Sequence, residues 1–272
     1  MAQPTALSVP SKLALRTRSA AVILPVALLA IWAGGLLFSL FVALVLVTMA
    51  WEWARLCAPG QIAIVAMTAG LGVAILIAVS IGHYWPAVAL GGLGAVVVAA
   101  SVREQTVVDR LIAAFGVVYL SAACAGAIWL RGLSEPGAQV LLWLVLVIVA
   151  TDVGAYAAGR TIGGPKLAPR ISPNKTWAGL IGGAAAAAVI GIAAAPFFAG
   201  FTGHLGRIAV IAACLAVVAQ AGDLLESHLK RRAGLKDSSN LIPGHGGVLD
   251  RLDGVLAAVP AFVALVVLGG AA

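Results

Sequence analysis

Side chains that could bind a metal ion or a phosphate group concentrate in residues 227–253, which read SHLKRRAGLKDSSNLIPGHGGVLDRLD. Four cations at positions 230–232 and 236 precede a Gly/Pro-rich turn, and Asp250, Arg251 and Asp253 follow it. Only 10% of the chain is charged, so this density is exceptional within the sequence. Such a segment could be a membrane anchor, a topology signal or a reaction site.

Carboxylates in and beside this segment indicate metal chemistry. Asp223, Glu226 and Lys230 lie at i, i+3 and i+7, on one face of a predicted helix. A carboxylate near a membrane is costly unless a metal or a cation pairs with it. Asp250 and Asp253 begin the last predicted helix, where acidic residues are equally typical of capping. Together, Asp223, Asp250 and Asp253 predict a Mg²⁺ site whose remaining ligands are water and phosphate oxygens.

Between these carboxylates lies the turn Pro243-Gly244-His245-Gly246-Gly247. Glycines allow sharp turns that bring backbone N–H groups against an anion. His245 could donate to a phosphate or act as an acid or base, although a structural role in the turn is equally compatible.

A second basic segment, residues 151–179, reads TDVGAYAAGRTIGGPKLAPRISPNKTWAG and begins with Asp152. Its cations are Arg160, Lys166, Arg170 and Lys175. We expect Ser172 or Asn174 to cap the following helix, whose free N–H groups and Lys175 would form an anion site. The alternatives are a basic loop that sets topology or one that binds anionic lipid headgroups.

The elements that must position these segments are membrane-spanning helices. The chain is 62% hydrophobic and has a mean hydropathy of +1.09, well above the values of soluble domains. We predict an all-α polytopic membrane protein of about nine transmembrane helices with a cytosolic-facing polar site. The expected spans are 20–33, 36–54, 62–81, 84–101, 111–130, 138–158, 177–200, 206–226 and 253–271, with a turn at Gly34-Gly35.

The loop charges predict an orientation for these spans. A cytosolic N-terminus places fifteen of the 17 Lys and Arg side chains in the cytosol and leaves Arg131 and Arg207 on the far side with the C-terminus. Both basic loops then share the cytosolic face. We divide the chain into a basic cytosolic tail (1–19), an N-terminal transmembrane region (20–130) and a C-terminal catalytic region (131–272), and we expect a bacterial inner membrane.

The two basic segments resemble the signature of the phosphatidate cytidylyltransferases, also called CDP-diacylglycerol synthases. The matching residues are Ser227, Leu229, Lys230, Arg231, Lys236, Asp237, Ser239, Ile242, Pro243, His245, Gly246, Gly247, Val248, Asp250, Arg251, Leu252 and Asp253. Residues 222–226 and 171–176 also look like family motifs, and the resemblance covers roughly 150–254. Ala178 stands where the family often has an acidic residue.

The resemblance implies an enzyme that joins CTP to phosphatidate, gives CDP-diacylglycerol and pyrophosphate, and requires Mg²⁺. It also implies contact with membrane lipids, a homodimer and no nucleic-acid partner. The implied catalytic residues are Lys175, Lys230, Arg231, Lys236, Asp237 and His245. The implied substrate-binding residues are Asp152, Ser172, Asn174, Lys175, Thr176, Ser227, Gly246, Gly247 and Arg251. Asp223 and Asp250 are the expected metal ligands, with Asp253 assisting.

Three other classes fit parts of the pattern. A secondary transporter would place its ionisable residues near the bilayer midplane, whereas here they gather at one face. A lipid-binding module would need the basic loops but not the carboxylates. A related CTP-dependent enzyme, either a lipid kinase or an archaeal-type CDP-lipid synthase, would share the nucleotide and metal sites and differ in the acceptor.

Overall fold

The computed structural model describes residues 12–133, 137–198 and 204–268. The described residues form nine α-helices: α1 (Lys12–Ala33), α2 (Gly35–Cys57), α3 (Ile62–Ser80), α4 (Tyr84–Ser101), α5 (Val107–Gly132), α6 (Gly137–Thr161), α7 (Trp177–Ala194), α8 (Leu205–Arg232) and α9 (Leu249–Leu268). Two short antiparallel strands, β1 (Lys166–Ala168) and β2 (Ser172–Thr176), form a hairpin between α6 and α7. The predicted all-α class is confirmed.

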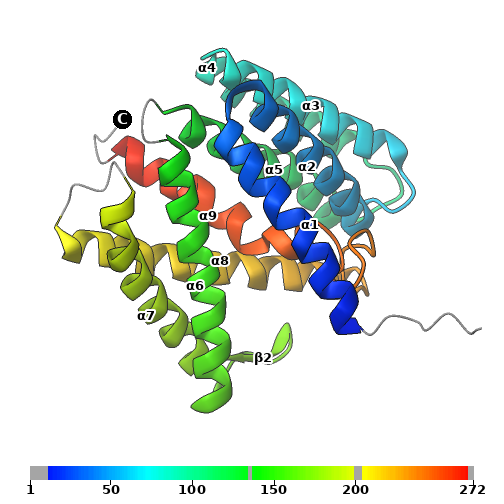
Figure 1. The fold of residues 1–272 in the computed structure, drawn as a ribbon. Coiled ribbons are helices and arrows are strands. Elements are labelled where there is room, and N and C mark those ends of the chain that lie inside the picture. Colours follow the sequence, from blue (N-terminus) through cyan, green and yellow to red (C-terminus); the bar gives the residue numbers. More distant parts are fainter. Residues whose placement is uncertain (1–11, 134–136, 199–203, 269–272) are drawn as a thin grey trace, which may run out of the picture.

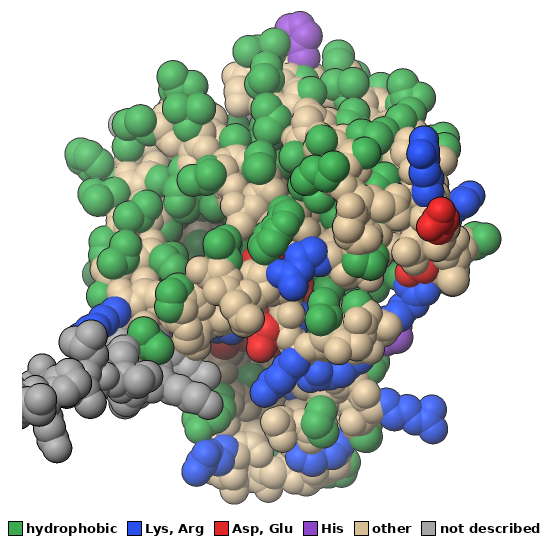
Figure 2. Space-filling model, turned by 90° about the vertical axis from the view of Figure 1, so that its right-hand side faces the viewer, with side chains coloured by type: hydrophobic (Ala, Val, Ile, Leu, Met, Phe, Trp, Pro, Cys, Tyr) green, Lys and Arg blue, Asp and Glu red, His purple; other side chains and the backbone are tan. Residues whose placement is uncertain are grey.

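Eight of these helices, α2 to α9, are long and apolar enough to cross a membrane. The apolar part of α1, Thr17–Ala33, is shorter. Many large hydrophobic side chains are exposed on the helices, as a lipid-facing surface requires. In Figure 2, hydrophobic side chains cover the upper part of the molecule, whereas Lys and Arg gather mainly in the lower half.

Three helix ends differ from the sequence prediction. Helix α1 begins at Lys12, so residues 12–19, expected in a basic tail, are helical. Helix α8 continues to Arg232 instead of ending near 226, and α9 begins at Leu249 instead of 253. The last turn of α8 and the first turn of α9 therefore carry charged residues of this segment, among them Lys230 and Asp250.

The predicted turn at Gly34-Gly35 is confirmed, with φ values of 64° and 50°. The guanidinium group of Arg131 explains why position 34 is a glycine, because it occupies the space that a side chain there would need. Its Nε and Nη2 donate to the carbonyl oxygens of Ile31 (2.5 Å) and Trp32 (3.0 Å) at the end of α1.

Two groups of helices meet along α5 and α9 (Figure 1). Helices α2 to α5 pack together in one group, and α6 to α9 form the other, with α6 against α7, α7 against α8 and α8 against α9. Helix α1 contacts both α2 and α6 and so bridges the two groups. The charged segment between α8 and α9 lies beside α2, which brings the two groups together at the site.

Candidate active site

The two basic segments meet in an ion pair. Lys175, on β2, places its Nζ 2.6 Å from Oδ2 of Asp223 on α8 and 3.3 Å from the carbonyl oxygen of Gln220. The hydroxyl of Ser227 donates to the other carboxylate oxygen, Oδ1 of Asp223, at 3.2 Å. The expectation that both segments share one face of the bundle is therefore confirmed.

A cavity of about 540 Å³ opens beside this ion pair, a size typical of small-molecule sites. It is lined by Asp152, Ala155, Tyr156, Gly159, Arg160, Asn174, Lys175, Thr176, Gly179, Gln220 and Asp223. Three helices and the hairpin thus contribute to one site. Among the described residues, the side-chain Nε2 of Gln220 is buried without a hydrogen-bond partner, so the cavity wall carries an unused donor.

Thr176, the last residue of β2, caps helix α7. Its Oγ1 accepts a hydrogen bond from the backbone N–H of Gly179 at 3.0 Å. The prediction that Ser172 or Asn174 caps this helix is wrong, because the hairpin keeps both in the strand, two or more residues before the helix begins. The hairpin instead aims Lys175 at Asp223.

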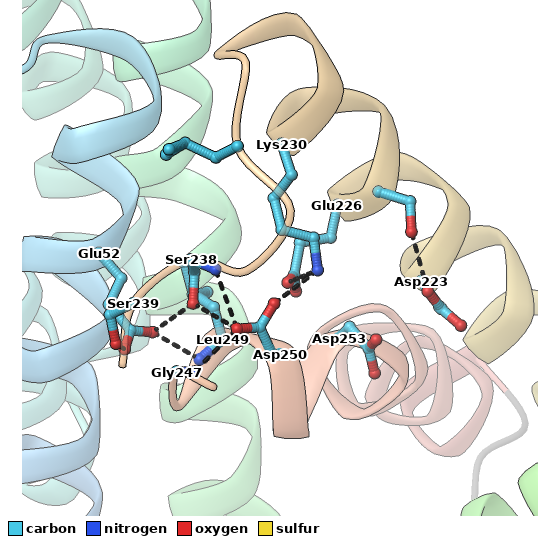
Figure 3. A network of polar contacts seen from close by, with 12 residues as sticks. Glu52, Asp223, Glu226, Lys230, Ser238, Ser239, Gly247, Leu249, Asp250 and Asp253 are labelled. Atoms are coloured by element: carbon cyan, nitrogen blue, oxygen red, sulfur yellow. Dashed lines mark hydrogen bonds and ion pairs between the residues drawn. The ribbon is translucent and has the colours of Figure 1, made fainter. Parts of the chain in front are cut away.

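Asp250 lies at the start of α9 and accepts four hydrogen bonds or ion-pair contacts. Its Oδ1 receives the ammonium of Lys230 at 2.6 Å. Its Oδ2 receives the backbone N–H groups of Ser238 (2.9 Å) and Gly247 (2.7 Å) and lies 3.0 Å from the Ser238 hydroxyl. Both oxygens are therefore occupied by the loop and by Lys230 (Figure 3).

Lys230 is 8% exposed and is held between two carboxylates. Besides Asp250, it contacts Oε1 of Glu226 at 3.0 Å. Of the other cations of this segment, Arg232 pairs with Asp109 at 2.7 Å, whereas Arg231, Lys236 and Arg251 are exposed, as is Asp237. The buried ion pairs fix the end of α8 against the start of α9, and the exposed cations remain accessible to a ligand.

His245 contacts helix α1. Its Nδ1 lies 2.8 Å from the hydroxyl of Ser19, which is also 3.0 Å from the carbonyl oxygen of Pro243. This contact places the tip of the turn against the first helix. It supports the structural alternative for His245, and the catalytic assignment stays a prediction.

The segment between α8 and α9 is also bound by Glu52 of α2, a residue that sequence reasoning missed. Its carboxylate is fully buried and accepts hydrogen bonds from Ser238, Ser239, Val248 and Leu249. The sequence did contain a signal for Glu52, because it is the only acid in the apolar run MAWEWARLC. An acid in a membrane helix costs free energy unless it is paired, so a partner could have been expected.

The predicted metal ligands do not form one cluster. In the described part of the chain, no group of three or more Asp, Glu, His or Cys side chains is arranged to hold a metal ion. Asp253 lies close enough to Asp223 and Asp152 for their charges to repel one another, whereas Asp250 points toward Lys230 (Figure 3). Two carboxylates suffice for Mg²⁺ when phosphate and water complete the shell. Asp223, whose oxygens contact Lys175 and Ser227, and the neighbouring Asp253 fit that role. Asp250 is buried and receives four donors, two of them backbone N–H groups, so it fits less well, and its assignment to the metal stays a prediction.

The structure thus divides the predicted residues into three sets. Those on the cavity are Asp152, Asn174, Lys175, Thr176 and Asp223. Those in the loop network are Lys230, Gly247 and Asp250. The lining of the cavity does not include Ser172, Ser227, Arg231, Lys236, Asp237, His245, Gly246, Arg251 or Asp253. Arg160 and Gln220 line the cavity and were not predicted as site residues.

Eight apolar helices carry the two charged segments, which an ion pair joins at one face, and this arrangement fits a membrane enzyme with an anionic substrate. Comparison with known sequences identifies the class. A profile of the cytidylyltransferase family matches residues 14–268, and the chain belongs to this family. The resemblance noted for residues 150–254 is confirmed and extends to the N-terminal helices.

Curated relatives carry the name phosphatidate cytidylyltransferase. The protein of Brucella suis biovar 1 is 41% identical over 250 residues, which is 91% of each chain. That of Pseudomonas aeruginosa is 38% identical over 272 residues, covering 92% of this chain and 95% of the relative. That of Haemophilus influenzae is 46% identical over 130 residues, 46% of this chain and 45% of the relative.

Proposed function

We propose that this chain transfers the cytidylyl group of CTP to phosphatidate and forms CDP-diacylglycerol and pyrophosphate. Family membership and the names of the full-length relatives support this activity. The observation that carries it is the Lys175–Asp223 ion pair, which joins the two charged segments at the wall of a cavity large enough for a small anionic ligand.

In this reaction a phosphate oxygen of phosphatidate attacks the α-phosphorus of CTP. The bond between that phosphorus and the bridging oxygen of the β-phosphate breaks, and pyrophosphate leaves with the electron pair. The attacking phosphate is already ionised, so no covalent protein nucleophile is needed. The protein must position two anions in line and neutralise their charge.

Lys175 and Arg160 supply positive charge inside the cavity, where they can bind phosphate oxygens. Asn174 and Gln220 add polar groups to the same wall. Arg231 and Lys236 are exposed at the end of α8 and can attract the triphosphate. Lys230 has a different role, since its ammonium holds Glu226 and Asp250 together.

Asp223 and Asp253 are the residues we assign to Mg²⁺. When bound, the ion would neutralise phosphate charge and orient the oxygens of the triphosphate. Asp223 also holds Lys175 at 2.6 Å, so the carboxylate positions a cation beside the phosphates. Asp152 lies near Asp223 and Arg251, and it completes the acidic side of the site.

The cavity and both basic segments face the cytosol in this proposal, where CTP is available. Asp109 at the start of α5 pairs with Arg232 at the end of α8 at 2.7 Å, so the opposite ends of these helices carry Arg131 and Arg207. This places the two predicted far-side arginines away from the basic segments. Family resemblance further supports a bacterial inner membrane and a homodimer, which crosslinking in native membranes would test.

One assay tests the activity. Purified protein in detergent micelles containing phosphatidate is supplied with CTP and MgCl₂, and CDP-lipid and pyrophosphate are measured. Equal amounts of both products are expected, and Asp223→Asn should abolish their formation while remaining folded. Near-normal turnover by that variant would contradict the role of Asp223. Phosphorylation of diacylglycerol by CTP, with release of CDP, would instead identify a lipid kinase.

A further inference from the structure

Glu52 is a buried acid on a helix outside the two charged segments. It lies near the end of α2, and its side chain is 0% exposed. An acid in such a place destabilises the protein unless its oxygens are satisfied by strong donors. The hydrogen-bond donors to the Glu52 carboxylate therefore indicate the role of this residue.

Among the described residues, the four donors to Glu52 come from residues 238–249. Oε1 accepts from the hydroxyl of Ser239 at 2.6 Å and from the N–H of Val248 at 2.9 Å. Oε2 accepts from the N–H of Leu249 at 2.7 Å and lies 3.1 Å from the hydroxyl of Ser238. The Glu52 carboxylate thus binds both ends of the segment 238–249 (Figure 3). The segment and the carboxylate together form a closed ring of contacts.

Gly247 shows that the loop is built around this carboxylate. A side chain at position 247 would overlap with Oε1 of Glu52 and with the hydroxyl of Ser238. The backbone at position 247 passes so close to both groups that only glycine fits without displacement. Gly247, the third glycine of the turn, is therefore required by the positions of Ser238 and Glu52.

The ring also orients the charged groups beside it. Ser238 lies between two carboxylates, because its hydroxyl is 3.1 Å from Glu52 and 3.0 Å from Asp250 and donates its single proton to one at a time. Asp250 in turn holds Lys230 at 2.6 Å. A chain of direct contacts thus runs from Glu52 through Ser238 and Asp250 to the end of α8.

We propose that Glu52 is a positioning residue for cytidylyl transfer, which holds residues 238–249 and, through Asp250 and Lys230, the charged end of α8 in the reactive arrangement. The N-terminal helices then serve the site directly. The inference deepens the proposed function and rests on it for the activity measurements.

Replacement of Glu52 by Gln isolates the carboxylate with little change in size. An ionised carboxylate offers acceptors only, whereas an amide replaces one oxygen with an NH₂ donor. The serine hydroxyls can rotate and accept from that NH₂, but the N–H of Val248 or Leu249 cannot. In either orientation of the amide, one backbone N–H at the start of α9 therefore loses its acceptor.

The experiment compares Glu52→Gln with two controls. Thr48→Ala changes a half-buried residue one turn earlier on α2, and Glu104→Gln makes the same chemical change at an exposed acid. We measure kcat per folded enzyme with CTP and phosphatidate, the unfolding temperature, and hydrogen exchange of the backbone amides. For Glu52→Gln we expect kcat to fall at least about tenfold, with faster exchange confined to residues 238–249. Both controls should match the unsubstituted protein.

A double substitution tests the contact itself. Ser239→Ala removes one of the four donors and also the acceptor of the Leu241 N–H at 3.1 Å, and it should lower kcat about threefold or more. Added to Glu52→Gln, it should cost little more, because the loss of a backbone N–H acceptor already releases the segment from position 52 and takes Ser239 out of reach. If Glu52→Gln does not fold, Ser239→Ala provides the test, through hydrogen exchange of residues 238–249 and through kcat.

Two results would overturn the proposal: unchanged exchange of residues 238–249 in these variants, or activity losses of the two substitutions that multiply as independent effects. A purely structural role would lower the yield of folded protein but leave kcat per folded enzyme unaltered. If the unsubstituted protein makes no CDP-diacylglycerol, the proposed function fails, and the exchange measurement still decides whether Glu52 holds the segment.

Discussion

The ammonium nitrogen of Lys230 lies 2.6 Å from Oδ1 of Asp250, a residue 20 positions further along the chain. The same nitrogen is 3.0 Å from Oε1 of Glu226. Both ends of the most charged segment are thereby held together inside the protein. The contact separates a structural carboxylate from those available to a metal, and this separation can be tested.

Asp250→Asn and Asp253→Asn should fail in different ways. The asparagine at position 250 would set an NH₂ against the ammonium of Lys230 or the N–H groups of the loop, so we expect lower stability, by about 1–3 kcal/mol, and low activity at any MgCl₂ concentration. Asp253→Asn should stay folded and regain activity partly as MgCl₂ is raised. Titrations of activity against MgCl₂ and unfolding curves check this. Restoration of the position-250 variant by MgCl₂ would return Asp250 to the metal site.

Lys175→Gln should lower kcat by about 100-fold or more, because it removes a cation that stabilises developing charge and leaves Asp223 without its partner. Lys166→Gln, an exposed position on the neighbouring strand, is the matched control and should retain activity. Steady-state kinetics with CTP and phosphatidate measure both. A loss of equal size in both variants would show that only the total charge of the hairpin matters.

Gly247→Ala should reduce activity strongly, since its methyl group would overlap with Ser238 and Glu52. Overpacking of this kind costs about 1–3 kcal/mol. Gly206→Ala serves as the control, because a methyl group there meets no atom within 4 Å. The measurements are CDP-lipid formation and thermal unfolding in detergent. Full activity of the position-247 variant would mean that the loop can shift without consequence.

Thr176→Ala should destabilise the start of α7 by about 1 kcal/mol through loss of the cap. Because Lys175 precedes the cap directly, activity should also fall. Thr176→Ser keeps the hydroxyl and should behave as the unsubstituted chain. Unfolding temperature and kcat are compared across the three proteins, and equal stability of the alanine and serine variants would refute the role of the cap.

The order of the helices was predictable because long apolar runs have few alternatives in a bilayer. Eight of the described helices are long and apolar enough to cross a membrane, so the predicted count of nine spans stays a prediction. Each of the nine predicted segments corresponds to a helix among the described residues. The ends of α8 and α9 were not predictable from hydropathy, because Lys230 and Asp250 enter these helices through contacts with each other.

Site residues that belong to a local sequence motif were predicted, and a site residue that is distant in the sequence from its partners was missed. Lys175 and Asp223 belong to recognisable motifs, and the structure brings them together. Asp250 and Asp253 are three positions apart on one helix, so the sequence could not tell which one faces the loop. Glu52 is separated from Leu249 by 197 positions, and no local pattern announces that contact.

That separation has a consequence for biosynthesis. Helix α2 emerges from the ribosome and enters the membrane long before residues 238–249 are made, so the carboxylate of Glu52 must wait at or near the bilayer without its partners. Only after the segment preceding the last helix is synthesised can the ring close. A chain that stops before Ser238 would retain the helices that precede α9 yet leave this buried acid without any of its four donors.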